Sequence, residues 1–202
     1  MPKGRWLPVT AAPKAEEGRA VASGFHGVTG AEARGANGVG EAEPLVGATA
    51  PVLVCACGNR ARGDDGLALA LAEELAGWGT PGVEVSMVGQ FVPELALELA
   101  GRTSVLFIDA DAAARVPARL EVLRPARISG GFSHRAHPAE VLMAWRMAFR
   151  RPPPPAFLLR LKGVWFGLRP QLSAQGMEAL SQGREMARAW LREQIEQSAT
   201  SD

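Results

Sequence analysis

Three groups of polar residues in the sequence could act together in chemistry. Asp64 and Asp65 follow the apolar run VLVCAC, Asp109 follows SVLFI, and His134 lies in the polar segment FSHRAHPAEVL. Two carboxylates and an imidazole form an oxygen-and-nitrogen ligand set that suits nickel, zinc, iron or manganese rather than copper(I). The general order of metal affinities does not choose among these four metals.

The acidic pair lies in the turn of a predicted βα unit. The run before the turn has no polar alternation, which is typical of a strand covered on both faces, and the leucines and alanines from Leu67 onward predict a helix. A phosphate-binding loop is disfavoured, because the turn lacks GxGxxG and Gly-Lys-Ser/Thr and places two negative charges where a phosphate would sit. A metal or a cationic partner fits better. The alternative is that Asp64 and Asp65 only cap the helix and complement its dipole.

The order of the elements predicts where these residues meet. A β-α-β-α-β order over residues 51–110 commonly places the strands in the spatial order 2-1-3, because crossovers are right-handed. The first and third strands would be neighbours, and their C-terminal ends would border a crevice at the switch point. Asp64 or Asp65 would face Asp109 there, and the loop before the next helix would bring His134.

The candidates also have purely structural interpretations. Asp109 could cap a loop, as aspartates at the ends of strands often do, and Asp111 is expected to be exposed to solvent in that loop. His137 precedes Pro138 and is better explained as a helix-start residue than as a ligand. His134 is therefore the preferred imidazole ligand.

The remaining pattern predicts an α/β fold, a three-layer α/β/α domain with a mostly parallel twisted sheet flanked by helices. A helix capped by Ser173 is expected to run to about Gln197, and Trp165 and Phe166 are expected in the core rather than in a peptide groove. The other expected elements are strands over 83–88, 120–123 and 157–164 and helices over 91–99 and 141–149.

Residues 1–50 form a separate compositional region. Gly, Ala, Glu and Pro dominate it and no strand or helix period is sustained, so burial cannot offset the entropy of ordering it. We therefore predict a disordered N-terminal extension over 1–50, a single domain over 51–197 and a C-terminal tail over 198–202. The extension should be dispensable for folding.

Composition limits the class of function. The chain has 22 basic and 21 acidic residues and a net charge of +1, which disfavours charge-driven binding of nucleic acid or membranes. No stretch approaches 18 uninterrupted apolar residues and no signal-peptide pattern is present, so a cytoplasmic protein is expected. Cys55 and Cys57 lie on the same face of a strand, where a buried, reduced pair is favoured over a disulfide or a C-x-C metal site.

The chain resembles the hydrogenase maturation proteases, endopeptidases that trim the C-terminus of the large subunit of nickel-iron hydrogenases. The resemblance covers about residues 51–195. VLVCACGNRARGDDGLALALAEEL is similar to the family's strand followed by Gly-Asn and Gly-Asp-Asp/Glu-Gly, and VLFIDA to its strand ending in Asp-Ala. SHRAHPAEVL is similar to its Ser-His loop, and GVWFGLRPQLS to its late strand and the Leu-Ser start of its last helix.

The resemblance implies a site and a substrate. The family's nickel-contacting acid falls on Asp65, its second acid on Asp109 and its histidine on His134, which would be both the metal ligands and the catalytic residues. The implied nickel is carried by the substrate, a hydrogenase large-subunit precursor, and another divalent transition metal could replace it in vitro. The implied enzyme is a monomeric peptidase of aspartic type, without a serine or cysteine nucleophile, that binds no nucleic acid and no membrane.

The resemblance leaves a second function open. Many members of the family have Asp-Gly-Gly after the second strand, whereas this chain reads SMVGQ over residues 86–90. The alternative is therefore a non-catalytic, metal-binding maturation chaperone or scaffold with the same fold.

Overall fold

The computed structural model describes residues 49–126 and 137–199. Most of the predicted N-terminal extension lies outside these residues, so the predicted domain boundaries stay predictions. His134 also lies outside them. The elements along the chain are β1 (Val52–Cys57), η1 (Gly63–Gly66), α1 (Leu67–Gly77), β2 (Val83–Val88), η2 (Pro93–Leu99), β3 (Ser104–Asp111), β4 (Ala118–Leu123), α2 (Pro138–Phe149), β5 (Ala156–Lys162) and α3 (Ala174–Ala199), where η marks a 3-10 helix.

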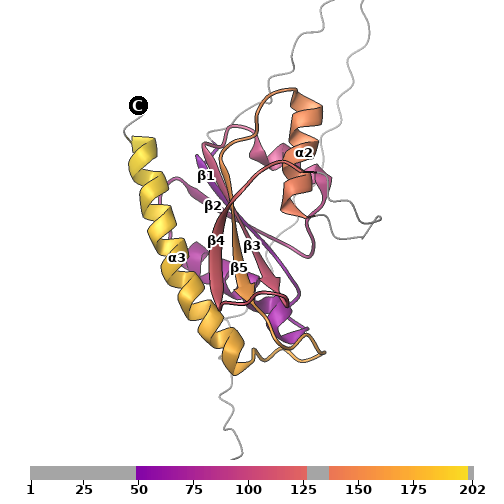
Figure 1. Cartoon of the computed structure of the whole chain (residues 1–202). Coiled ribbons are helices and arrows are strands. Elements are labelled where there is room, and N and C mark those ends of the chain that lie inside the picture. Colours follow the sequence, from indigo (N-terminus) through magenta and orange to yellow (C-terminus); the bar gives the residue numbers. More distant parts are fainter. Residues whose placement is uncertain (1–48, 127–136, 200–202) are drawn as a thin grey trace, which may run out of the picture. The chain divides into compact units, whose positions relative to one another are not determined.

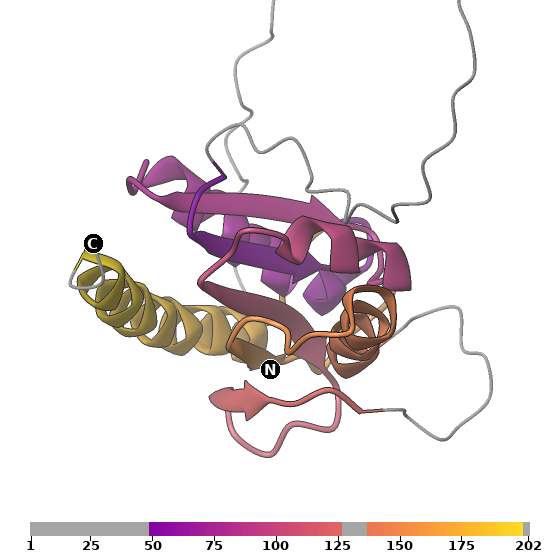
Figure 2. The same cartoon turned by 90° about the horizontal axis from the view of Figure 1, so that it is seen from above.

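The described strands form one sheet in the order β2-β1-β3-β5-β4. β2, β1, β3 and β5 are parallel, and β4 joins β5 as an antiparallel edge strand. Viewed from above, β4 is the outermost strand on its side of the sheet (Figure 2). The predicted 2-1-3 arrangement of the first three strands is confirmed, so the ends of β1 and β3 lie side by side.

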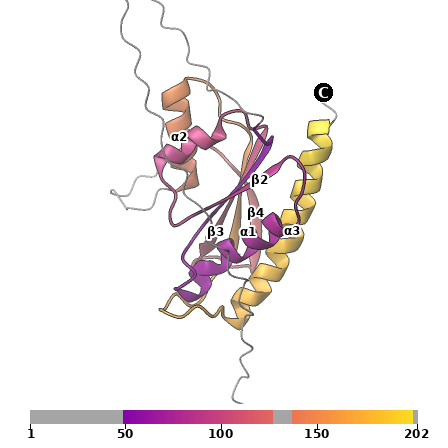
Figure 3. The ribbon, with the colours of Figure 1, turned by 180° about the vertical axis from the view of Figure 1, so that it is seen from behind.

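Helices cover both faces of this sheet, as the unbroken apolar pattern of β1 requires. α3 and α2 lie on opposite sides (Figure 1), and α1 lies on the same side as α3 (Figure 3). The predicted three-layer α/β/α fold is confirmed. Alternate residues of the strands point into two cores, one formed with α1 and α3 and the other with η2 and α2.

Three elements differ from their predicted forms. The segment predicted as a helix over 91–99 is the 3-10 helix η2, which begins at Pro93. β3 continues through Asp109 to Asp111, because β5 pairs with it as far as the register partners Asp111 and Lys162. β5 ends at Lys162, earlier than predicted, because the backbone N–H of Val164 turns away to bond a side chain.

The long C-terminal helix begins as predicted. The backbone N–H of Gly176 donates to the hydroxyl of Ser173 at 2.9 Å, which is an N-cap contact. Leu180, Trp190 and Leu191 on its inner side are buried against the sheet. None of the helices in the described ranges is both long and apolar enough to cross a membrane.

Candidate functional site

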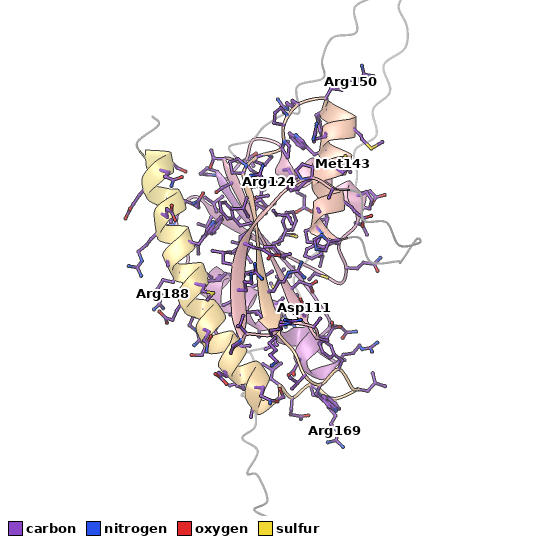
Figure 4. The ribbon with its side chains drawn as sticks, in the orientation of Figure 1. Asp111, Arg124, Met143, Arg150, Arg169 and Arg188 are labelled. Atoms are coloured by element: carbon purple, nitrogen blue, oxygen red, sulfur yellow. The ribbon has the colours of Figure 1, made fainter. Side chains whose placement is uncertain are left out.

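The strands β1, β3 and β5 end at one edge of the sheet, where the sequence predicts the site. Parallel strands present their C-terminal ends at one edge, and the loops that follow them meet there. β1 leads into η1 with the two aspartates, β3 ends at Asp111, and β5 leads into a loop over residues 163–173. Figure 4 shows Asp111 at this end of the sheet and Arg169 on the loop beyond it.

Asp64 is a structural residue. Its side chain is fully buried, and its carboxylate accepts hydrogen bonds from the backbone N–H groups of Val164 (2.8 Å), Trp165 (3.0 Å) and Ser173 (2.8 Å). The hydroxyl of Ser173 adds a fourth hydrogen bond at 2.7 Å. Asp64 therefore joins the turn after β1 to the loop between β5 and α3, across about a hundred residues of sequence.

These contacts correct the interpretation of Asp64 as a helix cap. The N-cap of α1 is Gly66, and no side chain caps that helix. Burial alone would raise the pKa of Asp64, but the N–H groups of Ser173, Val164 and Trp165 and the Ser173 hydroxyl bond the charged form and hold this pKa below its usual range. The carboxylate is thus ionised and occupied by its own protein.

Asp65 is held in the same turn by its backbone. Asp65 is a buried residue. Its backbone N–H donates to the carbonyl of Arg62 at 3.2 Å, and its backbone carbonyl accepts from the N–H of Asn59 at 3.1 Å. A Cβ on Gly58 would lie 2.0 Å from that carbonyl oxygen, so this close approach requires glycine. The 3-10 helix that carries Asp65 contacts β3. The turn therefore fixes Asp65 at the end of β1 and beside β3.

Asp109 lies on the strand next to β1, within β3 rather than after it. Because side chains alternate along a strand, it shares the face of Phe107, which packs in the core under α2. It is half-buried, and its register partner on β5 is Arg160. The fold thus brings the elements of Asp65 and Asp109 to one edge of the sheet, as predicted.

The third predicted ligand, His134, lies outside the described residues. Within residues 49–126 and 137–199 no cluster of three or more His, Cys, Asp and Glu side chains is arranged to hold a metal ion. The predicted triad of Asp65, Asp109 and His134 therefore stays a prediction.

His137 is the start of a helix, as its sequence context indicates. Its Nδ1 accepts from the N–H of Ala139 at 3.1 Å, and its own N–H donates to the carboxylate of Glu140 at 2.9 Å. These reciprocal contacts form a capping box with Pro138 in the first turn of α2. The role of His137 is therefore to begin α2.

A cluster around Arg160 was not predicted from the sequence. The Arg160 guanidinium donates to Glu121 at 2.9 Å and to Asp111 at 3.1 Å. Asp111 is thus an ion-pair partner at the end of β3 and not the exposed loop residue that was expected. A hollow of about 620 Å³ beside the cluster is lined by Arg160, Glu121, Asp111 and the connection from β3 to β4.

The same guanidinium reaches the ring of His137, with 3.2 Å between Nη2 and Nε2. A neutral imidazole accepts at one nitrogen only, so this contact and the contact from Ala139 cannot both be hydrogen bonds. Protonation of the ring would remove its one acceptor and place a second positive charge beside Arg160. Burial and the Arg160 charge accordingly lower the pKa of His137, against the opposing charges of Glu140 and Glu121.

One signal in the sequence could have revealed this cluster. Arg160 interrupts the apolar run of AFLLRLK, and an arginine inside a mostly buried strand requires carboxylate partners. The partners Asp111 and Glu121 could not be assigned from sequence, because the order in which β5 enters the sheet decides them.

Cys55 and Cys57 are buried and reduced, as predicted, and they lie on the α2 side of β1. Burial, with smaller contributions from Glu98 and Cys57, raises the pKa of the Cys55 thiol to about 12. The thiol of Cys57 faces the carbonyl of Gly89 at 3.7 Å. At neutral pH Cys55 is a thiol and not a thiolate nucleophile.

Several solved structures of hydrogenase maturation endopeptidases have a similar fold. The hydrogenase maturating endopeptidase HybD from E. coli has a TM-score of 0.58 and 22% sequence identity, over 71% of this chain and 93% of its own. The [NiFe] hydrogenase maturation protease HycI from Thermococcus kodakarensis has a TM-score of 0.54 and 20% identity, over 72% and 95%. An endopeptidase from Escherichia coli has a TM-score of 0.53 and 24% identity, over 71% and 93%.

No protein-family model matches the sequence, and a search of curated proteins gives no match. The likeness to the solved structures is one of fold, and it spans nearly their whole length. The described part of this chain therefore has the fold of the hydrogenase maturation endopeptidases.

Proposed function

We propose that this chain is a divergent hydrogenase maturation peptidase. It would remove the C-terminal extension of a hydrogenase large-subunit precursor that already contains nickel. The observation that carries this proposal is the turn after β1, which fixes Asp65 at the edge of the sheet beside the strand of Asp109, in the fold of known maturation endopeptidases.

The proposed roles follow from burial and partners. The Asp64 carboxylate is hydrogen-bonded to the loop between β5 and α3 and fixes the turn. Asp65, Asp109 and His134 would coordinate the nickel that the precursor carries. The metal belongs to the substrate, so its presence would complete the recognition surface. Hydrolysis itself needs no protein nucleophile: a water oxygen adds to the scissile carbonyl carbon, the C–N bond breaks, and the leaving amine takes a proton. The buried Cys55 thiol is unsuited to attack.

A non-catalytic maturation scaffold remains the second candidate. It is favoured by the end of β2 and the two residues that follow it, which read SMVGQ over 86–90 and supply no carboxylate where many family members have Asp-Gly-Gly. A scaffold would share the metal site and would bind the precursor without shortening it.

Intact-mass measurement of the precursor separates the two functions. The full chain should shorten the nickel-loaded precursor at its C-terminus and leave the nickel-free precursor intact. Asp65→Asn should abolish cleavage, because the amide neither carries the charge nor replaces a carboxylate ligand. Glu94→Gln, the same chemical change at an exposed position of η2, should cleave like the unaltered chain.

Each outcome selects one interpretation. A stable complex with the nickel-loaded precursor and no loss of mass would replace the peptidase by the scaffold. Cleavage of the nickel-loaded and nickel-free precursors to the same extent would show that the peptidase does not recognise nickel. The absence of both binding and cleavage would contradict a role in hydrogenase maturation.

A further inference from the structure

The loop between β5 and α3 presents an exposed apolar surface. Nine large hydrophobic side chains of the described residues are exposed, and three of them belong to one five-residue stretch of this loop, 164–168. These three are Val164 (43% exposed), Trp165 (38%) and Leu168 (84%). The expectation that Trp165 lies in the core is therefore wrong. A single exposed hydrophobic residue is ordinary, but a contiguous group marks a surface that binds something.

This exposure does not come from a loosely held loop. The Asp64 carboxylate binds the N–H groups of Val164 and Trp165, and the N–H of Asp64 donates back to the Trp165 carbonyl at 2.9 Å. The N–H of Gly63 donates to the carbonyl of Arg169 at 2.6 Å. The loop is thus fastened along its length to the turn after β1, and its apolar side chains point outward from a fixed backbone.

The indole of Trp165 is itself held in place. A Cβ on Gly63, which has a φ of 57°, would lie 2.3 Å from the indole ring, so the ring packs directly on the turn. A Cβ on Gly167 would lie 2.2 Å from the same ring. The indole is therefore packed against two glycines of fixed backbone and remains 38% exposed to a partner.

The charged rim of this surface is positive. The guanidinium carbon of Arg169 lies 6.0 Å from the centre of the Trp165 ring, and Arg62 reaches the carbonyl of Phe166 at 3.5 Å. Both arginines are exposed, whereas the two acids of the turn, Asp64 and Asp65, are buried. An apolar centre with an arginine rim is typical of the energetically important part of protein interfaces.

We propose that Val164, Trp165, Leu168, Arg62 and Arg169 form the docking surface for the precursor protein, and that they bind an apolar segment flanked by acidic residues. This inference rests on the proposed function. Its physical basis is the charge of the rim together with the hydrogen bonds that join the surface to the turn of Asp65. A protein bound here is held beside the metal site at a fixed distance.

The test compares precursor binding by full-length variants. Leu168→Glu places a negative charge at the most exposed apolar position, and Arg169→Glu reverses the rim charge. Val122→Glu on β4 and Arg192→Glu on α3 make the same two changes at exposed positions away from the surface. We expect Leu168→Glu to weaken Kd for the nickel-loaded precursor by about tenfold and Arg169→Glu by about threefold to tenfold, with the controls within about twofold.

Kinetics separate docking from chemistry. Leu168 would not touch the reacting atoms, so its substitution should raise KM and leave kcat unchanged at saturating precursor. The binding should also weaken with added salt for the unaltered chain and less for Arg169→Glu.

The failure of this inference is distinct from that of the proposed function. If the unaltered chain cleaves the precursor and both surface variants bind it as tightly, the docking surface is refuted and the peptidase stands. If the unaltered chain neither binds nor cleaves, the proposed function fails first. A dimer of the unaltered chain that Leu168→Glu dissociates would assign the surface to a second copy of the chain and overturn the proposal.

Discussion

The two sides of the proposed site are built by different physical means. On the side of β1, the Asp64 carboxylate is fully buried and binds three backbone N–H groups and one hydroxyl. On the side of β5, the Arg160 guanidinium remains 31% exposed and ion-pairs with Asp111 and Glu121, which are 23% and 28% exposed. Asp109 lies between these two regions of the sheet.

The difference assigns different tasks to the two sides. A buried carboxylate whose acceptor sites are used by the backbone fixes geometry, and removing it leaves several backbone donors without their partner. A partly exposed ion-pair cluster is screened by solvent and contributes less to stability. The β1 side therefore sets where Asp65 lies, and the β5 side controls the charge and the contacts around Asp109 and His137.

The largest effect is expected from Asp64. Asp64→Ala takes the acceptor from three backbone N–H groups and one hydroxyl and removes a fully buried charge from their centre, and we expect a loss of about 3–5 kcal/mol of unfolding free energy. For a chain of this size the melting temperature should fall by roughly 6–20 °C. Thermal unfolding followed by circular dichroism measures this.

Asp64→Asn sharpens that prediction. The amide keeps one acceptor oxygen but turns an NH₂ group toward the backbone donors, so it should be nearly as unstable as Asp64→Ala. A melting temperature of Asp64→Asn within about 2 °C of the unaltered chain would contradict the structural role given to the carboxylate.

A smaller effect is expected from Arg160. Arg160→Met removes the ion pairs with Asp111 and Glu121, and because all three side chains are partly exposed we expect a loss of about 1 kcal/mol or less. Chemical denaturation at low and high salt measures this loss. The difference between the two proteins should shrink as salt screens the pairs. A loss as large as that of Asp64→Ala would refute the contrast between the two sides.

His137 should make stability depend on pH. Its pKa is lowered in the folded chain, so the unfolded chain binds a proton first, at about pH 6.5. The free energy of unfolding should therefore be highest above this pH and should fall as the pH drops through about 6.5 toward the lower folded pKa. His137→Asn keeps an N-cap acceptor and removes the titration, so its stability should change less over this range. An unchanged pH dependence would exclude His137 as the cause.

The smallest effect is expected at Cys55. With its pKa raised to about 12, the thiol should resist alkylation by iodoacetamide in the native protein at pH 8 and react once the protein is unfolded in denaturant. Peptide mass analysis identifies the modified residue. Rapid modification of native Cys55 would show that β1 is not covered on its α2 side.

The sequence predicted the fold and most of its elements because the signals are local. The apolar runs of β1 and β3, the proline before α2 and the Ser173 cap are each legible within a few residues. The roles of Asp64 and Asp65 were not separable in this way. Both are acidic residues at one turn, and only the return of the chain at Val164 and Ser173 shows that the Asp64 carboxylate binds the loop between β5 and α3.

The β5 side was missed for the same reason. Arg160 meets Asp111 and Glu121 only because β5 lies between β3 and β4, and no spacing along the chain contains this information. The length of β3 also depends on β5, whose pairing carries the strand past Asp109.

Calorimetric titration of the full chain with nickel, zinc or cadmium tests the central claim most directly. The account predicts one binding site that weakens as the pH falls through about 6, because a ligating imidazole must be neutral. Asp65→Asn, Asp109→Asn and His134→Ala should each lose the site, whereas Asp111→Asn, two residues along the same strand, should keep it. Unchanged binding by Asp65→Asn or Asp109→Asn, or loss of binding only in Asp111→Asn, would contradict a metal site at the joined ends of β1 and β3.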